Sequence, residues 1–164
     1  MPVPLIRPVT AADLPAINDI YNHYVLHSTC TYQEEPSTIP EREEWFAAHG
    51  PELPATVAVE NDVVVGWASI SRFHRRSAYR NTVENSVYVR HDLHGRGIGS
   101  ILLGDSIDRA RSVGHRTILA LIDMDQKASI RLHVKFGFQQ AAHLREVGFK
   151  FGRWLDVVYL QLML

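Results

Sequence analysis

The chain has 164 residues, 46% of them hydrophobic, and its 17 Lys and Arg nearly balance its 18 Asp and Glu. That length supports one domain with one buried core and is short for two ordinary domains. Because the net charge is close to zero, no global electrostatic field would attract nucleic acid or an anionic membrane surface. We therefore expect a small molecule or another protein as the partner.

The sequence shows no pattern for secretion, membrane insertion or metal binding. Residues 1–7 lack the charged head and apolar core of a signal peptide, and no stretch approaches the roughly 18 apolar residues of a membrane span. A cytoplasmic protein is therefore expected. Cys30 is the only cysteine, which rules out an intramolecular disulfide, and we interpret it as an ordinary small residue. None of the nine histidines falls in an H-E-x-x-H motif, so no metal is expected.

The first half of the chain predicts a strand, two helices and a hairpin. The strand and the helices cover residues 5–6, 14–26 and 42–49. Thr10 offers a hydroxyl that can cap the first helix, and the break between Pro36 and Pro40 separates the two helices. Two β-branched runs flank Asn61-Asp62, whose turn chemistry predicts a hairpin of strands 56–60 and 63–71.

The second half alternates strands and helices. Strand, helix, strand, helix and strand are predicted over residues 83–90, 97–113, 117–122, 128–136 and 154–164. In the longest helix, Leu103, Ile107 and Ala110 recur at spacings typical of a buried face, and Gly114 stands where a helix would end. With one further strand before the last, the order is βααβββαβαββ, which predicts a mixed α/β sheet.

The segment from Val87 to Ser100 carries the strongest local signal, because a strand runs through a glycine-rich turn directly into a helix. Such a turn exposes backbone N–H groups at the positive end of the helix dipole, and its glycines allow close approach of an anion such as a diphosphate. The turn lacks the Lys-Ser/Thr ending of a P-loop and the third glycine of a dinucleotide-binding turn, which disfavours ATP and NAD. The alternative is a tight turn that only begins a helix.

Residues His94-Gly95-Arg96-Gly97-Ile98-Gly99 resemble the coenzyme A pyrophosphate loop of GNAT acetyltransferases, in which Gln or Arg usually takes the position of His94. A second block, Gln126 to Phe138, is similar to the family's later coenzyme-contacting helix, with Gln126 in place of the more usual Asn. The resemblance implies one GNAT domain over residues 1–164, with a twisted mixed sheet of about seven strands and about four helices. It also implies acetyl-CoA as cosubstrate, bound by Val87, Tyr88, Val89, Gly95, Arg96, Gly97, Ile98, Gly99, Ser100 and Gln126.

Nearly the whole chain resembles the phosphinothricin and methionine sulfoximine N-acetyltransferases within that family. The matching blocks are Ile20 to His23, Thr82 to Glu84 and Phe149 to Asp156. The resemblance implies direct transfer of an acetyl group from the thioester to the amine of a small amino-acid-like acceptor, without a covalent acyl-enzyme. It also implies a homodimer.

The same resemblance, together with the chemistry of the amine, indicates the reacting groups. An amino group must lose a proton before it attacks, and Glu84 matches the family's proposed base. The alternatives for Glu84 are an ion pair with Arg80 or another cation, or a role in acceptor positioning alone. His133 falls where many GNAT proteins carry a Tyr near the coenzyme sulfur, so it can donate a proton or order a water there. A histidine packed for structural reasons is the alternative.

The basic segment before the strand at residues 83–90 is expected to bind the acceptor. His74, Arg75 and Arg76 suit the carboxylate of a free amino acid, and the resemblance adds Asn85 and Ser86 beside Glu84. The alternative is a solvated basic loop. Two other functions remain open, namely a protein or peptide N-acetyltransferase and a coenzyme-binding sensor without transfer activity.

Overall fold

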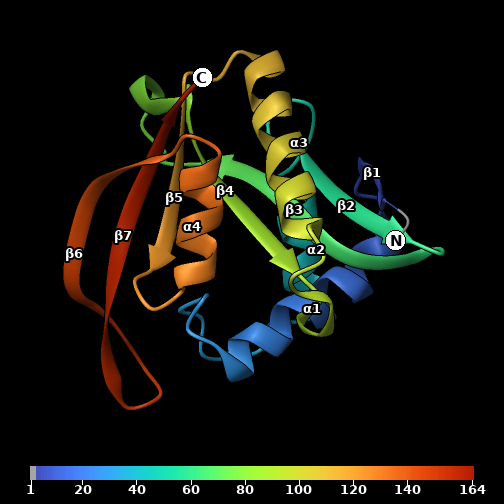
Figure 1. The fold of residues 1–164 in the computed structure, drawn as a ribbon. Helices are drawn as coiled ribbons and strands as arrows, with labels where there is room; N and C mark the ends of the chain where they lie inside the picture. Colours follow the sequence, from blue (N-terminus) through green and yellow to red (C-terminus); the bar gives the residue numbers. More distant parts are fainter. Residues whose placement is uncertain (1–2) are drawn as a thin grey trace.

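The computed structural model of the chain describes residues 3–164 as a seven-stranded sheet in the spatial order β1-β2-β3-β4-β5-β7-β6 (Figure 1). Neighbouring strands are antiparallel except for β4 and β5, which are parallel. The strands are β1 Leu5–Pro8, β2 Ala55–Glu60, β3 Val63–Arg72, β4 Thr82–Val89, β5 Thr117–Asp123, β6 Gln139–Lys150 and β7 Arg153–Met163. The predicted mixed α/β sheet and the predicted order of elements are confirmed.

Two helices cover each face of the sheet. One pair is α1 Leu14–His27 and α2 Ile39–Ala47, and the other is α3 Ile98–Val113 and α4 Lys127–Lys135. Ile17, Val57 and Trp67 belong to the core beneath α1 and α2. Leu103 and Ile118 belong to the core beneath α3 and α4, which Figure 1 shows on the near side of the sheet.

The helix α2 begins three residues before the predicted start at Arg42. Thr38 caps it, because the Glu41 N–H lies 3.4 Å from the Thr38 hydroxyl and the Thr38 N–H donates to the Glu41 carboxylate at 2.7 Å. Pro40 lies in the first turn, where its missing N–H costs nothing. The predicted break was therefore wrong at Pro40, which is part of the helix start.

The predicted hairpin between β2 and β3 is confirmed. Asn61 and Asp62 have φ values of 48° and 62°, the left-handed conformations of a two-residue hairpin turn. The strand β6 lacked predicted bounds, because it is an exposed edge strand whose pairing with β7 shifts twice. Among residues 3–164, no helix is both long enough and apolar enough to cross a membrane.

One glycine sets how closely α3 approaches the sheet. A Cβ on Gly66 would lie 2.9 Å from Leu102 Cδ1 and 2.9 Å from the Tyr88 carbonyl oxygen. A larger residue there would push α3 away from β3 and β4. The N-terminal end of α3 is thereby held against the strand that carries most of the predicted site.

Candidate active site

The strands β4 and β5 separate halfway along their length (Figure 1). Their parallel pairing covers Thr82↔Thr117, Val83↔Ile118 and Glu84↔Leu119, whereas β4 stays paired with β3 as far as Val89. The edge of β4 from residue 85 to residue 89 therefore has no neighbouring strand on the β5 side. This split leaves backbone groups free to contact a ligand.

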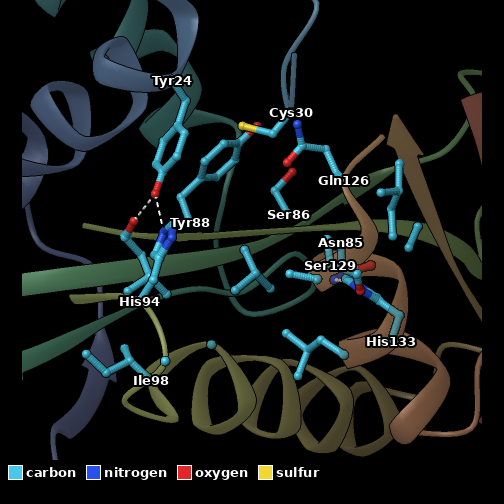
Figure 2. A pocket seen from close by; sticks show the side chains of 18 of the residues that line it. Tyr24, Cys30, Asn85, Ser86, Tyr88, His94, Ile98, Gln126, Ser129 and His133 are labelled. Atoms are coloured by element: carbon cyan, nitrogen blue, oxygen red, sulfur yellow. Dashed lines mark hydrogen bonds between the residues drawn. The ribbon is translucent and has the colours of Figure 1, made fainter. Parts of the chain in front are cut away.

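A cavity of about 320 Å³ fills the split between the two strands (Figure 2). It brings together most of the predicted site: Asn85, Ser86, Val87, Tyr88, Val89, Gly95, Gly97, Ile98, Gly99, Gln126 and His133. Residues that the sequence did not single out also line it, among them Tyr24, Leu93, Ile122 and Leu132. Arg96 and Ser100 adjoin this cavity without lining it.

The glycine-rich turn forms one end of the cavity. Gly95 and Gly97 have φ values of 78° and 83°, and a Cβ on either would meet no atom within 4 Å. Gly97 also caps α3 without a side chain, so within residues 3–164 no N-cap side chain engages the first N–H groups of the helix. This cradle fits a diphosphate, because the backbone donors and the helix dipole both favour an anion.

The basic side chains around the turn are already engaged by carboxylates. Arg96 pairs with Glu60 at 3.0 Å, and Arg90 pairs with Asp92 at 2.7 Å. Binding of an anion in the cradle therefore depends chiefly on backbone N–H groups.

His94, the departure from the family pattern, is held by a tyrosine of α1. The Tyr24 hydroxyl donates to the Val89 carbonyl and lies within hydrogen-bonding distance of His94 Nε2 (Figure 2). Because the hydroxyl proton goes to Val89, His94 Nε2–H is the donor to Tyr24. Tyr24 thus ties the start of the turn to the end of β4. No local motif marked this residue in advance.

His133 and Asn85 form a second linked pair in the cavity (Figure 2). His133 Nδ1 lies 2.8 Å from the Ser129 carbonyl, which can only accept, so Nδ1 carries the proton. His133 Nε2 then accepts from the Asn85 amide at 3.1 Å. Burial lowers the pKa of His133, which favours the neutral ring. In this arrangement the imidazole orients Asn85.

Gln126 and Cys30 lie on the same side of the cavity (Figure 2). The Gln126 amide donates to the Thr29 hydroxyl at 3.2 Å, which connects the start of α4 to the segment after α1. Burial raises the pKa of the Cys30 thiol, which favours the unreactive thiol over the thiolate. Lys150 supports this segment, because its ammonium donates to the carbonyls of Ser28 at 2.8 Å and Thr31 at 2.9 Å.

Glu84 lies on the opposite face of β4 from the Asn85 side chain, because side chains alternate along a strand. Glu84 is paired with Ser71 of β3, and its side chain lies on the same face of β4 as that of Ser86. Within residues 3–164, the Glu84 carboxylate makes no ion pair or hydrogen bond. Burial raises its pKa. The alternative of a pair with Arg80 is not observed, since Arg80 Nη1 donates to the Ser77 carbonyl.

The basic loop before β4 is exposed. His74 Nδ1 accepts from the Arg76 N–H at 3.1 Å, while Arg75 and Arg76 extend into solvent and line neither face of the split. The loop leads into β4 two residues before Glu84. Within residues 3–164, no cluster of three His, Cys, Asp or Glu side chains could hold a metal ion.

Comparisons with known proteins agree with this geometry. Residues 17–138 match the model of the Acetyltransferase (GNAT) family. The chain is 41% identical to the L-methionine sulfoximine/L-methionine sulfone acetyltransferase of Salmonella typhimurium, covering 97% of this chain and 94% of that protein.

Two solved structures extend the likeness to the whole fold. A phosphinothricin acetyltransferase from Sinorhizobium meliloti in complex with acetyl-CoA has a TM-score of 0.96 and 36% identity, over 99% of this chain and 89% of that one. A ribosomal-protein-alanine N-acetyltransferase from Brucella melitensis has a TM-score of 0.95 and 38% identity, over 98% and 99%.

Proposed function

The chain belongs to the acetyltransferase (GNAT) family, and we propose that it transfers the acetyl group of acetyl-CoA directly to the amine of a small amino-acid-like acceptor. The observation that carries the proposal is the split between β4 and β5 with the glycine cradle at one end. The acceptor class follows the methionine sulfoximine and phosphinothricin acetyltransferases to which the chain is similar over most of its length. The predicted family and the predicted fold are confirmed.

The cradle and the free edge of β4 are the proposed coenzyme site. Gly95 to Ser100 receive the diphosphate, and Val87 to Val89 offer backbone groups to the pantetheine arm, with Gln126 on the facing wall. When bound, acetyl-CoA supplies an acyl thioester. A strand N–H on the free edge of β4 polarises its carbonyl, as in other sites that stabilise developing negative charge on oxygen.

Glu84 is the proposed general base. Within residues 3–164 its carboxylate has no partner that would stabilise the charged form, and burial raises its pKa, which makes it a better proton acceptor. It lies on β4 next to Asn85 and two residues from Ser86, both of which line the coenzyme cavity. An ammonium group that arrives on this face can lose its proton to Glu84 and attack the carbonyl.

His133 is proposed to act through Asn85. The neutral ring fixes the Asn85 amide within the cavity, and proton donation from Nε2 would first require protonation of a buried imidazole. Asn85 and Ser86 are proposed to hold the acceptor.

His74, Arg75 and Arg76 are proposed to bind the acceptor carboxylate from the loop that leads to Glu84. Both arginines lack a carboxylate partner within residues 3–164, so their guanidinium groups are free for a ligand. Replacing both by Ala should raise KM for the amino acid by about tenfold or more and leave KM for acetyl-CoA unchanged. Equal changes in both constants would instead indicate a structural loop.

A homodimer is proposed through the hairpin of β6 and β7. Val147, Phe149, Phe151 and Trp154 of this hairpin are each between 52% and 62% exposed. Apolar side chains clustered in this way at a sheet edge are typical of a protein interface. The resemblance to the phosphinothricin acetyltransferases supports a second copy of the chain as the partner.

The experiment that tests the function measures thiol release from acetyl-CoA with a panel of acceptors. Methionine sulfoximine, methionine sulfone, phosphinothricin and ordinary amino acids are compared with a peptide that begins with alanine. Faster turnover of a free amino acid supports the proposal. The peptide is included because the chain is also similar to a ribosomal-protein-alanine N-acetyltransferase, which makes peptide acetylation the second candidate function. Coenzyme binding without thiol release for any acceptor would favour a sensor.

A further inference from the structure

A second cavity, of about 490 Å³, lies on the α1 and α2 face of the sheet. Its walls include Tyr21, Arg42, Trp67, Ser69, Ser86 and Tyr88. Ser86 and Tyr88 also line the coenzyme cavity, so the two cavities approach each other at β4. Glu84 shares this face of β4, between Ser86 and the loop that carries Arg75 and Arg76.

Arg42 is a buried cation in this wall without a counter-ion. It is 4% exposed, and within residues 3–164 no carboxylate lies within ion-pair distance of its guanidinium. Its Nε donates to the Asn18 amide oxygen at 3.2 Å. The rings of Tyr21, Trp45 and Trp67 surround its Cζ, with centroids at 4.9, 5.0 and 5.6 Å. A buried charge is costly unless it is paired, so this guanidinium is suited to receive an acceptor group from a ligand.

A second donor in the same wall is also without a partner. The Trp67 indole Nε1 is buried and makes no hydrogen bond within the described part of the chain. Glu41 is the one carboxylate among the lining residues, and its Oε2 accepts from the Thr38 N–H and hydroxyl. Arg42 and Trp67 are thus two buried donors in this wall, and the ligand group that complements them carries oxygen atoms.

We propose that Arg42, assisted by Trp67, binds the oxygen atoms at the end of the acceptor's side chain, such as those of a sulfone or a phosphinate. This inference rests on the proposed function. Arg42 and Ser86 line the same cavity, and Ser86 lies two residues along β4 from Glu84 on the same face. The proposed function assigns the α-carboxylate of the acceptor to the loop that carries Arg75 and Arg76. An amine held at Glu84 therefore leaves the acceptor's side chain to extend into the cavity that Arg42 lines.

Methionine and methionine sulfone form a matched pair of probes, because they differ only in the two sulfone oxygens. In Arg42→Met, KM for methionine sulfone should rise at least about tenfold, while KM for methionine and for acetyl-CoA should change less than about threefold. Trp67→Phe keeps the aromatic ring, removes the N–H, and should raise KM for methionine sulfone by a smaller factor. Arg116→Met replaces an exposed arginine and serves as the control.

Two further measurements separate binding from folding and from turnover. The Tm of Arg42→Met should stay close to that of the wild type, because the substitution removes a buried charge but also leaves the Asn18 amide oxygen without its donor. Calorimetric titration of the protein with methionine sulfone, in the presence of saturating coenzyme A, measures binding alone. Coenzyme A carries no acetyl group, so no transfer occurs during the titration. If methionine sulfone binds in a way that depends on Arg42 but no acceptor causes thiol release from acetyl-CoA, the result would support this inference and contradict the proposed function. Equal loss for both probes, unchanged affinity for methionine sulfone, or no binding of it by the wild type would overturn the inference.

Discussion

The substitution Glu84→Gln removes the proposed base and keeps its size. Because the carboxylate has no ion pair or hydrogen bond within residues 3–164, little beyond proton acceptance is lost with its charge. General-base contributions are typically about 100-fold or more, which corresponds to roughly 2.7 kcal/mol of transition-state stabilisation. We expect kcat to fall by that factor near neutral pH, with acetyl-CoA affinity unchanged by calorimetry.

The pH profile gives the sharper readout for this variant. Wild-type kcat/KM should fall as the pH drops through the raised pKa of Glu84, and this limb should be absent in Glu84→Gln. The deficit should shrink as the pH rises, because more of the acceptor amine is then already neutral. Glu43→Gln, an exposed change on α2, should behave as the wild type. A Glu84→Gln enzyme with wild-type kcat and an unaltered profile would refute the role of Glu84 as base.

Glu84→Gln should raise thermal stability, although it lowers activity. Burial raises the pKa of Glu84 in the folded chain, so folding favours its neutral acid. That stabilisation is present below the unfolded pKa of about 4.3 and is lost as the pH rises through the folded value. Glu84→Gln should therefore have a higher Tm than the wild type at pH 8, and the difference should be smaller near pH 4. A lower Tm at pH 8 would indicate a stabilising partner for the carboxylate.

Three further predictions follow from the site and the hairpin. Gly97→Ala should weaken acetyl-CoA binding at least about tenfold, because a side chain enters the cradle at a position with a left-handed φ. Gly50→Ala is the control and should have little effect. Equal acetyl-CoA affinities of Gly97→Ala and the wild type in calorimetry would contradict the proposed cradle. Replacement of Asn85 and His133 by Ala, singly and together, should show a coupling energy of about 0.5–3 kcal/mol in kcat/KM, and additive losses would mean that the two residues act independently. Trp154→Glu should give a monomer in size-exclusion chromatography with light scattering, and an unchanged dimer would exclude this edge as the interface.

The sequence predicted the elements and the glycine-rich turn before α3 because both depend on local patterns. Gly97 and Gly114 stand at the two ends of α3 and adopt left-handed conformations that few other residues accept. Asn61 and Asp62 determine the hairpin for the same reason. In these places a few adjacent residues contain the whole signal.

The remaining features depend on contacts between distant parts of the chain. Tyr24 lies 70 residues from His94, and Lys150 lies 122 residues from the Ser28 carbonyl that it contacts. Arg42 was predicted to begin a helix, and nothing beside it in the sequence indicates that it is a buried cation without a counter-ion. Such residues make these contacts only when elements far apart in the sequence pack together.

Direct transfer requires that acetyl-CoA and the acceptor are bound at the same time, and the cavities proposed for them meet at Ser86 and Tyr88. Cys30, the one cysteine of the chain, lines the cavity proposed for the coenzyme and is the residue on which an acetyl thioester could form. The most direct test is therefore a set of initial rates in which acetyl-CoA and a free amino-acid acceptor are both varied. Intersecting double-reciprocal lines are expected, with no acetyl group on the protein by mass spectrometry. Parallel lines and an acetylated Cys30 would contradict direct transfer.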